Sequence, residues 1–297
     1  MSREVLLVTG ASGLLGSHIV RRAGGKFELI AAYRSHPVMF PDARCVPLDL
    51  ADRKSVENLF RTAKPGLVIH TAALADVDYC EDHPDEAWAV NAEGTAYVAR
   101  ACRETGARLV HISTDAVFDG SRGMYAEDDE PRPINIYART KFEAERRVRE
   151  TCPESLIVRT AFYGSGLSWR KGLAQWALDR LRSGEPFPMF TDVFFSPIYV
   201  GDLVEILFES YRKGLSGIYH VGGRERCSKY EFGMALARTF ALDPGNLTPG
   251  VLADVPLRAP RPKDISLDVS KITRDLGRPM PTLAEGLRRF RDDQLRM

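Results

Sequence analysis

The chain has 297 residues, of which 44% are hydrophobic and 27% are charged, proportions typical of globular rather than disordered proteins. Lys and Arg number 41 against 40 Asp and Glu, so the net charge of +1 gives no general attraction to nucleic acid or to anionic membranes. No apolar run approaches the roughly 20 residues that span a bilayer, and the N-terminal residues do not resemble a signal peptide. The five cysteines are scattered without a CxxC motif, which argues against a disulfide framework. These properties predict a cytoplasmic globular protein.

Short apolar runs alternate with helical patterns in the first half of the chain. The predicted strands cover residues 5–8, 29–33, 45–48, 67–72, 109–113 and 156–160. The predicted helices between them cover 13–23, 53–63 and 85–104, and another begins near residue 137. This alternation is typical of a parallel sheet with helices on both faces, so we predict a doubly wound, Rossmann-like α/β fold. Ligands of such sheets bind at the carboxyl ends of the strands.

The alternation stops after residue 160, which suggests a second part of the chain. A Gly/Ser-rich loop at 164–172 precedes helical patterns at 173–181, 230–240 and 283–290, with a short strand at 218–221. We expect residues 1–163 to form a dinucleotide-binding domain, to which 190–222 return. Residues 164–189 and 223–297 should form a smaller C-terminal substrate-binding lobe.

A glycine-rich turn joins the first predicted strand to the first predicted helix. Its glycines have the spacing GxxGxxG, which suits a tight turn, close approach of a pyrophosphate and close packing of the helix on the sheet. Glycines also serve ordinary turns, but this position between strand and helix favours a dinucleotide. The residues predicted to contact it are Gly10, Ser12, Gly13, Leu14, Leu15 and Gly16.

The ends of the next strands indicate which dinucleotide binds. NAD sites usually carry an acidic residue after the second strand, whereas this chain has Arg34, which can pair with the 2′-phosphate of NADPH or be a solvated surface residue. NADPH is therefore the predicted cofactor, with NADH as a second acceptable one. Asp49 could bind the adenine amino group, or it could cap the following helix. Further predicted contacts, which packing would explain as well, are Leu50, Ala72, Ala73 and Leu74.

A group of residues with acid–base chemistry follows the fifth predicted strand. Tyr137 and Lys141 are four positions apart, so they share one face of a helix. A nearby ammonium lowers the pKa of a phenol from its usual value of about 10, which makes the phenol a better proton donor and acceptor. Lys141 could also hold the nicotinamide ribose, while Thr114 could bind a carbonyl oxygen. A YxxxK pair arises often by chance, but here it lies downstream of a glycine turn in the expected place.

Longer motifs carry a family resemblance. They cover residues 68–73, 90–92, 112–120, 125–131, 133–141, 217–222 and 261–268. On these motifs the chain resembles the extended short-chain dehydrogenase/reductase family, and within it the dTDP-4-dehydrorhamnose reductases. The resemblance implies an NAD(P)H-dependent oxidoreductase that acts on a ketone or alcohol group of a nucleotide sugar. It assigns Thr114, Tyr137 and Lys141 as the catalytic triad.

The same resemblance bears on the substrate site, metal and assembly. It places Asp115 at the sugar site, although Asp115 could equally cap a loop. Some relatives hold Mg²⁺ at a dimer interface with a glutamate where this chain has His18, so we expect no metal. A homodimer is compatible with the resemblance. The Pro-rich basic loop at 259–263 contains Arg261, which could grip the diphosphate of the substrate or simply be part of a solubilising loop.

Three functions follow from these features. The first is NADPH-dependent reduction of a nucleotide-linked 4-keto-6-deoxy sugar at C4, with Tyr137 as the proton donor. The second is a nucleotide-sugar epimerase or dehydratase that retains NAD; the absence of an acidic residue at Arg34 speaks against it. The third is an NADP-binding subunit without turnover, because the chain also resembles the regulatory β subunit of methionine adenosyltransferase.

Overall fold

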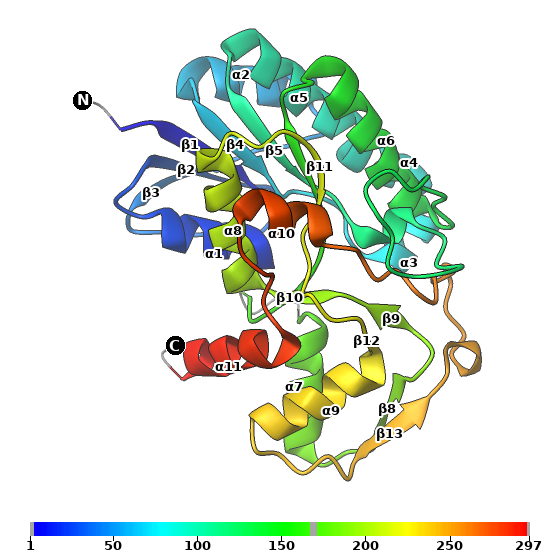
Figure 1. Cartoon of the computed structure of the whole chain (residues 1–297). Coiled ribbons are helices and arrows are strands. Elements are labelled where there is room, and N and C mark those ends of the chain that lie inside the picture. The colour runs from blue at the N-terminus through cyan, green and yellow to red at the C-terminus, as the bar shows by residue number, and fades with distance from the viewer. Residues whose placement is uncertain (1–2, 167–170, 296–297) are drawn as a thin grey trace. The chain divides into compact units, whose positions relative to one another are not determined.

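The structure is a computed structural model that describes residues 3–166 and 171–295 (Figure 1). It divides into two compact units. Unit 1 comprises Met1–Thr114, Asn135–Val158 and Leu207–Ile218. Unit 2 comprises Asp115–Ile134, Arg159–Ile206 and Tyr219–Met297. The division differs from the expected domain boundaries in assigning the segments 115–134, 159–163, 190–206 and 219–222 to unit 2.

A seven-stranded sheet organises unit 1. Its strand order is β11-β6-β5-β4-β1-β2-β3, and the pairs β1–β2, β1–β4, β2–β3, β4–β5 and β5–β6 are parallel. The strands are β1 Val5–Thr9, β2 Glu28–Tyr33, β3 Ala43–Pro47, β4 Leu67–His70, β5 Arg108–Ile112, β6 Leu156–Arg159 and β11 Gly217–His220. Reversal of the order at β1 is the mark of a doubly wound sheet, so the predicted fold class is confirmed.

Helices cover both faces of this sheet. In Figure 1, α2 (Arg53–Ala63), α5 (Gly94–Thr105) and α6 (Ile136–Thr151) lie on one face and α1 (Leu14–Ala23) on the other. The central strands are largely buried: four of the five residues of β1 and all four residues of β4 are buried. Burial on both faces explains why these strands are continuous apolar runs rather than alternating ones.

The helix expected at 85–104 is interrupted. It is α4 (Pro84–Ala87), then a π-helical segment Trp88–Glu93, then α5. Asn91 in the π segment is fully buried and bonded to distant residues, as described below. The sequence pattern also leaves out α3 (Val77–Asp82) and the 13-residue helix α8 (Val200–Arg212). Contacts distant in sequence determine these features, so local periodicity does not reveal them.

Unit 2 combines short strand pairs with helices. The pairs are β7 (Ala161–Tyr163) with β10 (Pro197–Tyr199), β8 (Phe187–Phe190) with β13 (Leu247–Gly250), and β9 (Phe194–Phe195) with β12 (Cys227–Ser228). The helices are α7 (Leu173–Ser183), α9 (Lys229–Thr239), α10 (Ser270–Leu276) and α11 (Leu283–Gln294). Aromatic rings of Tyr163, Phe232 and Phe290 meet edge to face between these elements and form the core. The predicted loop at 164–172 lies partly outside the described residues.

Candidate active site

The turn between β1 and α1 has the geometry of a phosphate-binding turn. Gly10 has a φ of +70°, and a Cβ there would lie 2.7 Å from the backbone nitrogen of Ala72. A Cβ on Gly16 would collide with the carbonyl oxygen of Gly10, so this glycine allows α1 to pack against the turn. Gly13 is exposed, and as the N-cap residue of α1 it supplies no side-chain cap. The turn therefore leaves room for an anionic group at the start of the helix.

Arg34 lies at the end of β2 and forms an ion pair at the surface. Its Nη2 is 3.1 Å from Oε1 of Glu86, and its side chain is 49% exposed. The Tyr79 hydroxyl donates to Oε2 of the same carboxylate at 2.6 Å. The hydrogen bond from Tyr79, and then that from Arg34, lower the pKa of Glu86. A 2′-phosphate at Arg34 would therefore compete with Glu86 for the guanidinium.

The other predicted adenine contacts follow β3. Asp49 is exposed and accepts a hydrogen bond from the backbone of Ala51 at 3.0 Å. The helix cap is Asp52, which accepts from the backbone of Lys54 at 2.9 Å, so Asp49 does not cap α2. Leu50 is buried and belongs to the core of unit 1. These positions leave the Asp49 side chain accessible to a ligand.

Asn91 holds the loop after β4 in place. Its Oδ1 accepts from the backbone N–H of Leu74 at 2.8 Å, and its Nδ2 donates to the Leu74 carbonyl at 3.0 Å. The same Nδ2 donates to Oγ1 of Thr140, which in turn donates to the carbonyl of Tyr137 at 2.8 Å. One buried amide thus connects a predicted cofactor-binding segment to the first turn of α6.

A hydrogen-bond chain of fixed direction lies beside this amide. Thr95 donates its only hydroxyl proton to the carbonyl of Asn91 at 2.6 Å, so it accepts from Nε2–H of His70 at 3.0 Å. Nδ1 of His70 must then accept from the Thr9 hydroxyl, which lies 2.6 Å away. His70 is therefore a neutral imidazole, and burial lowers its pKa to about 3.

The first turns of α6 present Tyr137 and Lys141. The side chain of Asn135 caps the helix by accepting from Ala138 N–H at 2.9 Å, and Glu81 accepts from the N–H of Ile136 at 3.0 Å. Tyr137 is half-buried, whereas Lys141 is only 3% exposed. Thr114, two residues after the end of β5, is also buried in unit 1.

Lys141 lies against the end of β5. Its Nζ donates to the carbonyl of Ile112 at 2.8 Å and is 3.4 Å from Nε2 of His111. Burial lowers the pKa of Lys141 to about 8, against an opposing effect of Glu145. At neutral pH the side chain is therefore mainly an ammonium, and it loses its proton as the pH rises through about 8.

Of the predicted substrate residues, Asp115 and Arg261 belong to unit 2, whereas Thr114 belongs to unit 1. Asp115 is buried at the start of a 3-10 turn, Asp115–Val117. Its charge acts on Lys229, whose pKa burial lowers to about 8 while Asp115 opposes that shift. Lys229 Nζ lies 3.2 Å from the ring centroid of Phe195. Sequence analysis missed this lysine, which is the first residue of α9.

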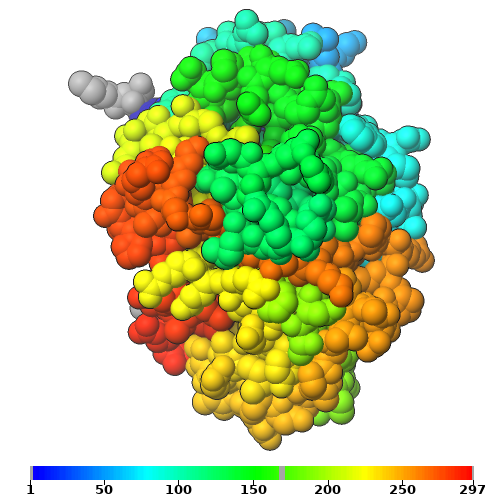
Figure 2. Space-filling model, turned by 45° about the vertical axis from the view of Figure 1, so that its right-hand side comes forward, coloured from blue at the N-terminus to red at the C-terminus, as the bar shows by residue number. Residues whose placement is uncertain are grey.

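Arg261 also belongs to unit 2, in a loop at its surface that is orange in Figure 2. It is half-buried and donates through Nη1 to the carbonyl of Ala259 at 2.8 Å. Lys263 pairs with Asp192 at 3.2 Å. The side chain of Arg261 is thus held by its own loop, and Lys263, two residues later, already has a carboxylate partner.

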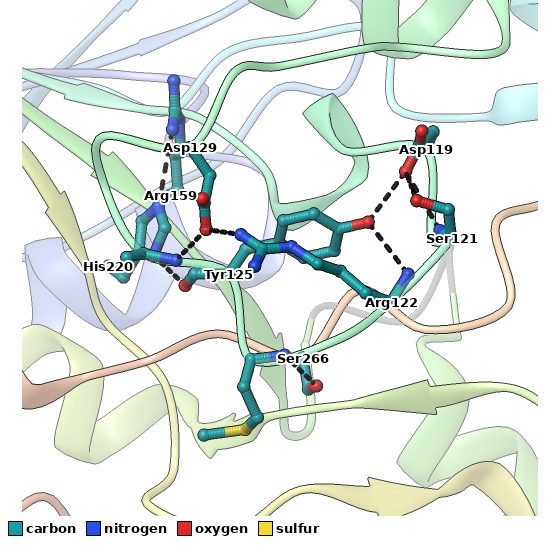
Figure 3. Close-up of polar contacts among 10 residues, drawn as sticks. Asp119, Ser121, Arg122, Tyr125, Asp129, Arg159, His220 and Ser266 are labelled. Carbon is teal, nitrogen blue, oxygen red and sulfur yellow. Dashed lines mark hydrogen bonds and ion pairs between the residues drawn. The ribbon is translucent and has the colours of Figure 1, made fainter.

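The loop that carries several family motifs is stabilised by its own side chains (Figure 3). The Tyr125 hydroxyl donates to Asp119 at 2.7 Å, and Arg122 pairs with Asp129. The carbonyl of Tyr125 accepts from Nδ1 of His220 at 2.9 Å. Many residues of the motifs therefore shape this loop and need no contact with substrate.

Neither a metal cluster nor a membrane span is found in the described part of the chain. No group of three or more His, Cys, Asp or Glu residues there could hold a metal ion. His18, the residue on which the expectation of no metal rests, is 2.8 Å from a guanidinium nitrogen of Arg22. No described helix is both long and apolar enough to cross a bilayer.

Comparisons with known proteins place these features in context. The model of the family described as "RmlD substrate binding domain" matches residues 4–296. A Haloferax volcanii protein named "Probable low-salt glycan biosynthesis reductase Agl14" is 36% identical over 94% of this chain and 95% of its own. Methionine adenosyltransferase 2 subunit beta of Bos taurus is 30% identical over 93% of this chain and 84% of its own. The crystal structure of a dTDP-4-dehydrorhamnose reductase from Bacillus anthracis in complex with NADP has a TM-score of 0.85 at 30% identity, covering 98% and 99% of the two chains.

These findings confirm several expectations from sequence. The family resemblance and the oxidoreductase class are confirmed by the family match and by the reductases among the relatives. Both likenesses, to the reductases and to the methionine adenosyltransferase subunit, are present. The individual roles predicted for site residues are not tested by these comparisons.

Proposed function

The chain belongs to the RmlD substrate-binding domain family, and from this premise we propose that it is an NADPH-dependent reductase of a nucleotide-linked 4-keto-6-deoxy sugar. The observation that carries the proposal is the buried ammonium of Lys141, one helical turn from Tyr137 and bonded to the end of β5. A surface lysine in a chance YxxxK pair would be solvated. Burial of this one at the end of a parallel strand is typical of a functional site.

The glycine turn and Arg34 fit a phosphorylated dinucleotide. The Cβ positions of Gly10 and Gly16 leave no space for side chains, and Gly13 is exposed at the helix start. We infer that this turn holds the pyrophosphate, Arg34 the 2′-phosphate and Asp49 the adenine, and that the cofactor lies against Ala72–Leu74. When bound, NADPH supplies a hydride to the carbonyl carbon.

The chain's own residues supply the proton and the orientation. Thr114 donates a hydrogen bond to the keto oxygen, and the Tyr137 phenol gives its proton to that oxygen as the carbon is reduced. Lys141 stabilises the resulting phenolate and donates to the nicotinamide ribose. Asp115 and Arg261 hold the sugar and the diphosphate.

The first experiment is a substrate screen. NADPH oxidation is measured against dTDP-, GDP- and UDP-linked 4-keto-6-deoxy sugars and against the free sugars. We expect turnover of one nucleotide-linked class only. Retention of NAD through purification, with isomerised or dehydrated products, would instead identify an epimerase or dehydratase. NADPH binding without turnover of any sugar would instead favour an NADP-binding subunit without turnover, in line with the likeness to the methionine adenosyltransferase subunit of Bos taurus.

Arg261→Ala tests the substrate class. A diphosphate contact remote from the reacting carbon should raise KM for the nucleotide sugar by about 10-fold or more, the range of a charge-assisted hydrogen bond, and leave NADPH affinity unchanged. Lys263→Ala is the matched control, since that lysine already pairs with Asp192. Equal kinetics in both variants and the wild type would place the diphosphate elsewhere.

A further inference from the structure

His111 has a buried ring nitrogen without a partner. The side chain is fully buried in β5, and Nδ1 makes no hydrogen bond to any residue in the described ranges. Buried polar atoms are almost always bonded, because an unbonded one destabilises the folded state. A phenylalanine would fill a similar volume without this cost, so packing alone does not explain a histidine here.

The other ring nitrogen faces the catalytic lysine. Nε2 of His111 is 3.4 Å from Nζ of Lys141, near the upper limit for a hydrogen bond. An ammonium can only donate, so Nε2 must accept and the ring proton must be on Nδ1. Nδ1 is the unpartnered atom. The contact with Lys141 therefore forces the proton to the side of the ring where nothing accepts it.

We propose that His111 is a positioning residue for Lys141, holding the ammonium at the end of β5 through Nε2 at the expense of an unbonded Nδ1–H. With Ile112 O as the second acceptor at 2.8 Å, two of the three ammonium protons are fixed. The third is then directed by the first two. This inference rests on the proposed function, in which that proton reaches the nicotinamide ribose.

His70 provides an internal comparison. It is paired in register with His111 on the adjacent strand β4, and the two rings stack at 5.4 Å. Both nitrogens of His70 are bonded, at 2.6 Å to Thr9 and at 3.0 Å to Thr95. The two histidines are equally buried, but they differ in their hydrogen bonds. His111, which contacts Lys141, has an unbonded ring nitrogen, whereas His70 has none.

The charges around Lys141 set the expected pH dependence. The neutral rings of His111 and His70 face it from β5 and β4, and Glu145 acts on it from the next turn of α6. Burial lowers the pKa of Lys141 to about 8, so ribose binding should weaken as pH rises through that value. Loss of the Nε2 acceptor removes a stabilisation of the ammonium, and the pKa should fall further.

The test compares His111→Phe, His111→Gln and His70→Phe. Melting temperature is measured for each, with the NADPH dissociation constant by fluorescence from pH 6 to 10 and turnover of the substrate identified in the screen. His111→Phe should keep or raise the melting temperature, yet weaken NADPH binding and kcat/KM about 10–100-fold, the range of a hydrogen bond to a charged group. Its alkaline loss of binding should begin at lower pH than in the wild type.

The two other variants separate positioning from packing. His111→Gln, whose amide oxygen can replace Nε2, should restore part of the binding and move the alkaline limb back towards that of the wild type. His70→Phe should lower the melting temperature without moving that limb, because the two hydrogen bonds it removes go to Thr9 and Thr95 and not to Nζ.

Wild-type binding and pH profile in His111→Phe would overturn the proposal, as would a binding loss that follows the melting temperature with no pH shift. If His111→Phe does not fold, His111→Leu takes its place beside His111→Gln: an alkaline limb displaced to lower pH in the Leu variant and restored in the Gln variant supports positioning, and limbs that coincide with that of the wild type in both variants contradict it. Lys141→Met separates a failure of the proposed function from a failure of the role proposed for His111. If it too binds NADPH and turns over normally, the proposed function itself fails, and not only the role of His111.

Discussion

Lys141 and Arg34 are the two cations that the sequence assigns to the dinucleotide, and the structure surrounds them differently. Lys141 is 3% exposed and bonded to the carbonyl of a strand residue, and its pKa is lowered to about 8. Arg34 has a side chain 49% exposed and pairs with a surface carboxylate. Burial makes the first charge sensitive to every neighbour, whereas solvent and salt screen the second. Changes near Lys141 should therefore have larger effects than changes near Arg34.

The largest effect is expected for the residue one turn from the buried lysine. Tyr137→Phe removes the proton donor and keeps the ring, so kcat should fall by about 10²–10⁴ while NADPH still binds. Steady-state kinetics and a fluorescence titration with NADPH measure the two quantities. Near-normal kcat would eliminate the proposed mechanism and favour a binding role for the chain.

A substitution of Asn91 tests whether its buried hydrogen bonds to Leu74 and Thr140 stabilise the protein. Asn91→Ala leaves the backbone groups of Leu74 without their partner, which should cost about 1–3 kcal/mol in the free energy of unfolding. Chemical denaturation measures this cost. Thr62→Ala is the matched control, since that exposed hydroxyl bonds only within its own helix and should change stability little. Equal stability of both variants would show that the network adds nothing beyond packing.

Substitutions of Arg34 and Glu86 should have smaller effects, and they should change the preference for NADPH over NADH in opposite directions. Arg34→Asp should lower the ratio of kcat/KM for NADPH over NADH by about 10-fold or more, since it removes a phosphate partner and adds a repelling charge. Glu86→Gln frees Arg34 from its competitor and should raise the same ratio a few-fold, an effect that salt diminishes. An unchanged ratio in both variants would mean that Arg34 does not bind the 2′-phosphate.

No effect is expected from metal removal. His18 lies beside the guanidinium of Arg22, which disfavours a cation at that position. Excess EDTA should leave turnover unchanged over hours. A loss that Mg²⁺ restores would contradict this prediction and call for a search for the metal ligands.

Separation along the chain distinguishes the features that the sequence could predict from those that it could not. Glycine spacing, the apolar runs and the YxxxK pair act over a few residues, and the turn, the central strands and α6 were predicted from them. The motif residues Asp119 and Tyr125 were also recognised, but their hydrogen bond indicates a loop-shaping role that a motif does not reveal.

Other features depend on residues far apart in the chain. The pairing of Arg34 with Glu86, the register that stacks His70 on His111, and the amide of Asn91 between Leu74 and Thr140 all join separate elements. The π-helical segment that carries Asn91 has no local signature in the sequence. Sequence by itself determined the fold class, and it predicted a cofactor-binding role for the glycine turn and a catalytic role for Tyr137 and Lys141. Only tertiary structure decided the protonation and hydrogen bonding of these residues, because burial and long-range contacts fix where each proton lies.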